Sequence, residues 1–114
     1  MKLSAHFDSS EFKCKDGSYK VPDPKLIQVL EAIREKAGKS LKINSGYRSP
    51  AYNKKVGGSP NSQHLLSKAA DIVIAGMTPS EVAKIAESCG ATGIGVYKTF
   101  THVDVRPSKA RWNG

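Results

Sequence analysis

The strongest constraint on the fold is a helix with one apolar face in the first third of the chain. Asp23-Pro24 predicts where it begins, because aspartate caps helix N-termini and proline is tolerated in the first turn. Apolar residues then recur every three or four positions, and Gly38 ends the pattern. Such a face has to be buried against a second layer of structure. Its members are Leu26, Ile27, Leu30, Ile33 and Ala37.

That second layer is predicted to be a β-sheet. Strand patterns occur at residues 41–45, 69–74, 93–97 and 100–105, the last two as a terminal hairpin. Two more helices are expected, one from the capping box Thr78-Pro79-Ser80-Glu81 to Gly90 and one from Ser49-Pro50 to about Val56. The predicted class is therefore α+β, an antiparallel sheet of three to five strands with two or three helices packed on one face.

Length and composition indicate one globular domain. The chain has 114 residues, 39% hydrophobic and 25% charged, as in ordinary folded proteins. Residues 1–22 are expected to form a loop-rich N-terminal segment and residues 107–114 a polar tail. No apolar run approaches the roughly 18 residues of a membrane span, so no membrane partner is expected. We expect a monomer.

The net charge of +8 favours polyanionic partners. The lysines are scattered along the chain, and no nucleic-acid-binding motif accompanies them. We therefore expect attraction to an anionic substrate matrix and no nucleic acid partner. A purely solubilising role of the charge stays open.

The N-terminal residues lack the apolar stretch of a secretory signal, so we expect synthesis in the cytoplasm and action elsewhere only after release or export. Cys14 and Cys89 have no Cys-x-x-Cys spacing, which excludes a zinc ribbon and the corresponding redox motif. A Cys14–Cys89 disulfide stays open, although the lack of a signal argues against it. Cys89 is expected to be a buried small hydrophobe.

Two of the three histidines, His64 and His102, are candidate ligands together with nearby aspartates. Six residues separate His64 from Asp71, and His102 lies two positions before Asp104. On a strand, His102 and Asp104 share a face while Val103 points to the core. Two imidazoles and one carboxylate form the ligand set of a catalytic zinc site with one position open for water.

Each piece also has an ordinary explanation. A His-x6-Asp spacing often arises by chance, His102 can bond a backbone carbonyl, and Asp71 can cap a turn. His6 is expected to be a surface or packing residue rather than a ligand. The coincidence of the other residues in one small chain favours a metal site, with one Zn²⁺ per chain.

Four motifs together resemble the zinc D-alanyl-D-alanine carboxypeptidase family (peptidase family M15), which includes small phage endolysin peptidases. The hedgehog signalling domain shares the fold of this family. The motifs are Ser45-Gly46-Tyr47-Arg48-Ser49-Pro50, Ser62-x-His64-x-x-Ser67-x-Ala69-x-Asp71, Gly93-Ile94-Gly95-Val96-Tyr97 and His102-Val103-Asp104-Val105-Arg106. They occur in the family's order and span most of the chain.

The resemblance implies that His64, Asp71 and His102 are the zinc ligands. It also implies that Arg48 contacts a substrate carboxylate or carbonyl, for which a planar guanidinium is suited. A purely structural role of Arg48, tying two loops together, stays open. Ser62 and Gln63 are expected to line the substrate groove, and Tyr97 to pack there or donate a hydrogen bond.

Two positions depart from the family pattern. Ser67 stands where the family usually has glycine. We expect it to need a backbone conformation that glycine takes more easily, so that the loop differs slightly from the family's. Thr99 stands where several members carry a catalytic glutamate, and a threonine cannot serve as a base. Asp104 is the nearest ionisable substitute, either as the base or as a carboxylate that holds a histidine ligand.

The expected function is that of a zinc-dependent peptidase acting on the stem peptides of bacterial peptidoglycan, as a carboxypeptidase or an endopeptidase. The alternative is a non-catalytic, zinc-containing peptidoglycan-binding module of the same fold. A small nucleic-acid binder rests on charge alone. No sequence pattern settles which peptide bond is cleaved.

Overall fold

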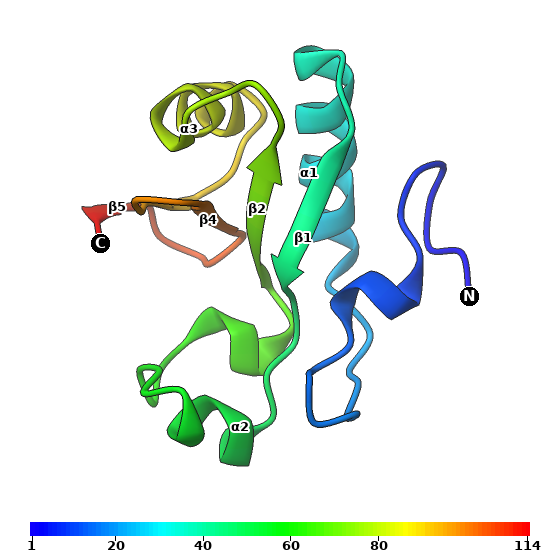
Figure 1. Ribbon diagram of the computed structural model, residues 1–114, viewed down its shortest axis with the longest axis vertical. Coiled ribbons are helices and arrows are strands. Elements are labelled where there is room, and N and C mark those ends of the chain that lie inside the picture. Colours follow the sequence, from blue (N-terminus) through cyan, green and yellow to red (C-terminus); the bar gives the residue numbers. More distant parts are fainter.

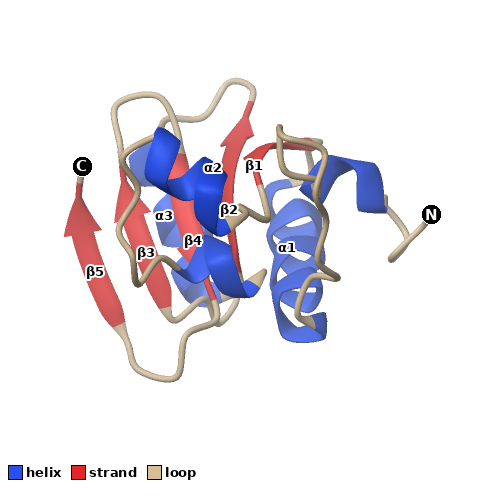
Figure 2. Ribbon diagram, turned by 90° about the horizontal axis from the view of Figure 1, so that it is seen from below, coloured by secondary structure: helices blue, strands red, loops and turns tan.

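The computed structural model describes residues 1–114 as a five-stranded sheet with helices on both sides (Figures 1 and 2). The strands are β1 Leu41–Ser45, β2 Ala69–Ile74, β3 Gly93–Val96, β4 Thr101–Asp104 and β5 Ala110–Asn113, in the order β1-β2-β4-β3-β5. The helices are α1 Pro24–Ala37, α2 Pro50–Lys55 and α3 Pro79–Ser88, with two 3₁₀ turns, η1 Ser9–Phe12 and η2 Gln63–Leu66. None of these helices has the length and apolar character needed to cross a membrane.

The hydrophobic core lies between the sheet and helices α1 and α3. The apolar face of α1 enters it, and Leu30 and Ile33 are fully buried. Alternate residues of the central strands point to the same core, including Ile72 of β2 and Val103 of β4. Helix α2 lies on the other side, in front of the strands in Figure 2 while α3 lies behind them. The second face of β2 and β4 is thereby left to polar side chains.

The α+β class and the predicted helix ends are confirmed. The carboxylate of Asp23 accepts a hydrogen bond from the backbone N–H of Lys25 at 2.8 Å. Gly38 closes α1 with a left-handed φ of 67°. Thr78 and Glu81 form both bonds of the capping box of α3, and β3 and β4 pair as the predicted hairpin.

The C-terminal residues differ from the prediction. Residues 110–113, expected in a polar tail, form β5, which pairs in parallel with β3 and makes the sheet mixed. The strand lies at an edge and its residues alternate between partly buried and exposed, so it needs no apolar run. Backbone bonds attach its ends, from the N–H of Ala110 to Thr92 O at 3.0 Å and from the N–H of Gly114 to Val96 O at 2.8 Å.

The N-terminal segment is anchored by two aromatic side chains. Phe7 and Phe12 are buried and meet edge to face, with 6.2 Å between ring centroids. Cys14 in this segment is also buried, whereas Cys89, which was expected to be buried, is partly exposed. Both thiols are free, so the disulfide that stayed open is not formed.

Ser67 adopts a backbone conformation that glycine takes more easily. Its φ is 56°, in the left-handed region, where a non-glycine residue costs roughly 1–2 kcal/mol. The Ser67 hydroxyl donates to the backbone oxygen of Lys20 at 2.8 Å, and Ser67 O accepts from the N–H of Asp23 at 3.0 Å. The serine thus ties the end of η2 to the segment that precedes α1.

We expect Ser67→Gly to leave the free energy of unfolding nearly unchanged, because relief of backbone strain offsets the lost hydrogen bond. Ser67→Ala keeps the strain and loses the bond, so it should lower that free energy by about 1 kcal/mol. Urea unfolding of both variants measures the difference. Equal destabilisation by the two changes would contradict the role given to the backbone conformation.

Candidate functional site

A row of paired residues crosses the sheet on the face opposite the core. The strand registers pair Ser45 with Asp71, Asp71 with His102, His102 with Gly95, and Gly95 with Trp112. Directly paired residues point to the same face of a sheet. The register therefore places the side chains of Asp71, His102 and Trp112 on one surface, in one line.

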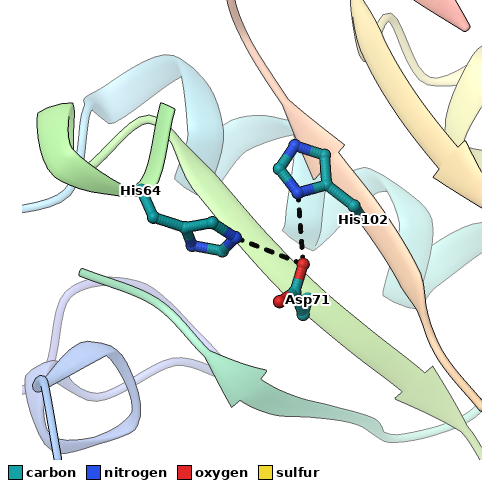
Figure 3. Close-up of side chains that lie close together, drawn as sticks. All are labelled: His64, Asp71 and His102. Atoms are coloured by element: carbon teal, nitrogen blue, oxygen red, sulfur yellow. Dashed lines mark hydrogen bonds and ion pairs between the residues drawn. The ribbon is translucent and has the colours of Figure 1, made fainter. Parts of the chain in front are cut away.

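His64 joins this line to complete a triad with Asp71 and His102 (Figure 3). It is carried by η2, and His64 Nε2 and His102 Nδ1 each lie 3.2 Å from Asp71 Oδ1. One possible ligand atom from each residue lies within 4.8 Å of the others. All three residues are buried. The structure therefore brings together the three residues that the sequence predicts as metal ligands.

Each imidazole has an inner nitrogen, which faces Asp71, and an outer nitrogen, which faces away from it. The hydrogen-bond partner of the outer nitrogen determines whether the inner nitrogen of a neutral ring carries a proton or a lone pair. His64 Nδ1 lies 2.7 Å from the backbone oxygen of Gly46, which only accepts, so the proton of a neutral ring sits on Nδ1. His102 Nε2 lies 2.7 Å from Asp104 Oδ2 and carries its proton for the same reason. Two nitrogen lone pairs and one carboxylate oxygen then converge in a buried space. Such an arrangement requires a cation between them, either protons or a metal ion.

Two of the three ligand spacings in the triad match those around a zinc ion. Tetrahedral coordination with bonds of about 2.0–2.1 Å separates the ligand atoms by about 3.3 Å. The two distances to Asp71 Oδ1 are both 3.2 Å. The bonds from the outer nitrogens to Gly46 and Asp104 orient the rings as the outer partners of metal-bound histidines do. Two imidazoles and one carboxylate leave a fourth position for water or substrate.

Neighbouring groups in the site shift one another's pKa values in favour of the charged forms. Burial raises the pKa of Asp71. When protons rather than a metal ion lie between the three residues, the inner nitrogens of His102 and His64 donate hydrogen bonds to Asp71, and these outweigh burial and hold its pKa well below its usual range. Burial lowers the pKa of His102, while Asp104 and Asp71 raise it, and the net change is an increase. For Asp104, the bonds from His102 and Arg106 outweigh burial and lower the pKa. Both carboxylates are therefore ionised at neutral pH.

Asp104 lies behind His102 with both carboxylate oxygens occupied. Its side chain is 0% exposed. Oδ2 accepts from Arg106 Nη2 at 2.6 Å in addition to His102, and Oδ1 accepts from Arg106 Nε at 2.9 Å. Of the two roles left open for Asp104, this geometry favours the carboxylate that holds His102 over the base. Thr99 is exposed between β3 and β4 and does not line the cleft over the triad.

This cleft has a volume of about 580 Å³ and is lined by all four residues expected to bind substrate: Arg48, Ser62, Gln63 and Tyr97. Arg48 Nη2 lies 3.5 Å from Asp71 Oδ2, and Arg48 Nη1 lies 3.4 Å from Asn53 Oδ1. These long contacts leave guanidinium N–H groups able to bind a ligand. Gln63 Oε1 is buried without a hydrogen-bond partner. His6 takes no part, since its Nδ1 lies 2.6 Å from Glu31 Oε1, away from the cleft.

Several contributors to the site were not expected from the sequence. Trp112 and Arg106 line the cleft from the C-terminal part of the chain. A Cβ on Gly93 would overlap the carboxylate of Asp104, and a Cβ on Gly95 would overlap the indole of Trp112. The sequence did contain one indication of this arrangement. Gly93 and Gly95 are two residues apart, so they lie on the same face of β3 and leave room there for side chains from neighbouring strands.

A family model described as Peptidase M15 matches residues 5–105. The chain belongs to the M15 peptidase family. The M15 resemblance expected from the four sequence motifs is therefore confirmed.

Two relatives of this M15 chain carry the name of peptidoglycan L,D-endopeptidase MepK. The Haemophilus influenzae protein, named as a probable enzyme of this type, is 35% identical over 102 residues, which are 81% of this chain and 54% of that protein. The Escherichia coli K12 protein is 32% identical over 96 residues, 76% of this chain and 53% of that protein. The M15 chain thus spans about half the length of the curated relatives that it matches.

The fold of this M15 chain also matches a solved structure, the Serratia marcescens L-Ala D-Glu endopeptidase ChiX. The TM-score is 0.56 at 18% identity, and the match covers 75% of this chain and 80% of that chain. At this identity the likeness shows a shared fold.

We expect Asp104→Asn to destabilise this M15 domain by about 2 kcal/mol, since it leaves the half-buried Arg106 without its carboxylate. The pKa of Asp104 is lower in the folded chain than its ordinary value of 3.8. Its stabilisation is therefore present above the ordinary pKa and is lost as the pH falls through the folded one. Between about pH 5 and pH 2, the free energy of unfolding should fall more steeply for the parent than for the variant in urea titrations.

Glu87→Gln is the matched control for the Asp104 variant. It removes a carboxylate that also pairs with an arginine, at 3.1 Å from Arg111 Nε, but Glu87 is 60% exposed. Exposed pairs contribute little, so this control should change neither the stability nor its slope with pH. Identical slopes for Asp104→Asn and the parent would contradict the role given to Asp104.

Proposed function

We propose that this chain is a zinc-dependent endopeptidase that hydrolyses peptide bonds in the stem peptides of bacterial peptidoglycan. The observation that carries the proposal is the convergence of His64 Nε2, His102 Nδ1 and Asp71 Oδ1 in the lining of an open cleft. Membership of the M15 family supports peptide hydrolysis. The names of the MepK relatives support a peptidoglycan substrate, and they favour an endopeptidase over the carboxypeptidase that the sequence left open.

In this proposal His64, Asp71 and His102 hold one zinc ion. A zinc ion bound there supplies Lewis-acid polarisation of a carbonyl and activation of water. The surrounding residues keep the ligands ready for it: Gly46 O and the Asp104 carboxylate hold the outer nitrogens of the two rings. Arg106, in turn, keeps Asp104 ionised and fixed in position.

Arg48 is proposed to bind the substrate next to the triad. Its guanidinium lies beside Asp71 and lines the cleft, with side-chain exposure of 19%. A fixed cation in a partly buried position stabilises negative charge that develops on a carbonyl oxygen during hydrolysis, and it also binds a carboxylate. Ser62, Gln63 and Tyr97 line the same cleft and are proposed to contact the peptide on either side of the cleaved bond.

One observation favours a second candidate, the zinc-containing module that binds peptidoglycan without cleaving it. Asp71 is the one carboxylate among the residues that line the cleft, and it belongs to the triad. Asp104 is enclosed by His102 and Arg106, and Thr99 is no base. The net charge of +8 suits an anionic wall under either candidate. The two candidates therefore differ in turnover, not in what they bind.

Digestion of purified peptidoglycan separates these candidates. With one equivalent of Zn²⁺ we expect soluble products of peptide-bond cleavage, which disappear on chelation and return when Zn²⁺ is added. His64→Ala should reduce product release to background, because it removes one of three ligands. Mass spectrometry of the products identifies the cleaved bond, and products that lack only a terminal residue would indicate a carboxypeptidase.

His6→Ala is the control for the loss of a histidine and should retain full activity, since His6 is exposed and bonded to Glu31. Zinc-dependent binding to insoluble peptidoglycan without soluble products would establish the binding module instead. Activity that survives both chelation and His64→Ala would exclude a zinc mechanism.

Replacement of Arg48 tests its proposed contact with substrate. Arg48→Lys keeps the charge but loses the planar pair of donors, and we expect a decrease in kcat of about 10²–10³, the range seen when a donor to a reacting oxygen is lost. Zinc content should stay at one equivalent, because Arg48 is not a ligand. Arg34→Lys, in α1 and outside the cleft lining, is the matched control and should leave kcat unchanged. Unchanged kcat in Arg48→Lys would leave Arg48 with only the structural role.

A further inference from the structure

We propose that Trp112 is a positioning residue that holds the ring of His102 so that Nδ1 faces His64 and Asp71. The inference rests on the proposed metal site and adds to it a residue from a different strand, β5. Trp112 does not act on the substrate in this proposal. It acts through His102.

The indole of Trp112 reaches across the intervening strand β3 to the ring of His102. Trp112 and His102 lie on strands separated by β3, and two strand spacings amount to about 9.5 Å. Their ring centroids are nevertheless 5.0 Å apart, with 52° between the ring planes. The indole crosses β3 at Gly95, the residue paired with both of them, where any Cβ would overlap its Cε2 and Nε1 atoms. Gly95 is therefore the opening through which Trp112 reaches His102.

The indole is itself fixed. Trp112 Nε1 donates a hydrogen bond to the hydroxyl of Tyr97 at 2.9 Å. The guanidinium of Arg106 lies over the indole ring, 4.9 Å from its centroid. Arg106 bonds the carboxylate of Asp104, which accepts from His102 Nε2. Four side chains thus form a closed circuit of contacts from His102 through Asp104 and Arg106 to Trp112 and back to His102.

This circuit restrains both the position and the rotation of the His102 ring. Asp104 holds Nε2 but leaves the ring free to pivot about that bond. The ring of His64 and the indole of Trp112 lie 5.1 Å and 5.0 Å from the His102 ring by centroids, close enough for both to limit the pivot. Without the indole, the ring of His102 loses this contact, and we expect Nδ1 to be held less firmly toward Asp71. Loss of an outer partner that hydrogen-bonds a ligand typically weakens metal binding 10- to 100-fold, and we expect loss of this ring contact to fall at the lower end of that range.

The experiment measures metal affinity in the full chain, using Co²⁺ absorption and competition with Zn²⁺. We expect Trp112→Ala to weaken Zn²⁺ binding by about 10-fold or more and to change the Co²⁺ spectrum. Trp112→Phe should restore most of the affinity, because a flat ring still restrains His102. Arg111→Ala is the matched control and should change neither quantity. Arg111 neighbours Trp112 on β5, but its side chain bonds Glu87 and the backbone oxygens of Thr92 and Ala110 rather than the indole or His102.

A double-mutant cycle tests the part played by Gly95. Gly95→Ala should weaken Zn²⁺ binding about as much as Trp112→Ala, because the added methyl displaces the indole. The two changes combined should be no worse than either alone, since there is no indole left to displace. Additive losses would overturn the inference, because Gly95 would then act independently of Trp112. Unchanged Zn²⁺ affinity in Trp112→Ala would overturn it directly.

The parent protein provides a measurement that needs no variant. Trp112 is the single tryptophan, so all tryptophan fluorescence reports on this contact. Titration with Zn²⁺ should change that fluorescence until one equivalent is bound. The affinity from this titration should equal the affinity from Co²⁺ competition. If Zn²⁺ binds but the fluorescence does not respond, the positioning role fails while the proposed function stands. If the parent binds no Zn²⁺, the proposed function itself fails, and the inference fails with it.

Discussion

The side chains of strands β2 and β4 alternate between the two faces of the sheet, and the two faces are different environments. On one face Ile72 and Val103 are fully buried in the apolar core, and on the other Asp71 and His102 stand side by side. A shift of the β2–β4 pairing by one residue would exchange these faces, placing charge in the core and apolar groups in the cleft. The backbone ladder that specifies the core therefore specifies the triad as well.

Most buried polar groups around the triad have hydrogen-bond partners. Burying imidazoles and carboxylates is costly unless each has a partner, and here the outer atoms are all satisfied, by Gly46 O for His64 and by Arg106 for Asp104. The unsatisfied demand is concentrated at the inner atoms around Asp71 Oδ1. The protein is thus stable around the site and leaves one localised requirement for positive charge at its centre.

Much of this arrangement could be predicted from sequence because local rules apply to it. Helix caps such as Asp23 and Thr78 are read from neighbouring residues, and the strand repeat predicts that Val103 and His102 point to opposite sides. The ligand set followed from residue type and spacing together with the family resemblance. Ser67 was correctly singled out as a position with an unusual backbone conformation.

The remainder depended on contacts between distant segments. β5 is an edge strand held by backbone bonds, which leave no apolar pattern to detect, so Trp112 was placed in a tail. The role of Asp104 depended on where Arg106 folds, and the sequence left both alternatives open. The burial of Cys14 comes from the path of the N-terminal segment over the domain, which the polar neighbours of Cys14 in the sequence do not indicate.

Positions 95 and 112 share the space above Gly95, so substitutions at one of them should depend on the residue at the other. Because the indole of Trp112 fills the volume that any larger residue at position 95 would need, neither position can diverge alone without loss. We expect a bulkier residue at position 95 only in chains that lack the tryptophan, because the two side chains would occupy the same volume. Among homologous chains, the two positions should therefore covary, and the order of their replacement should be directional.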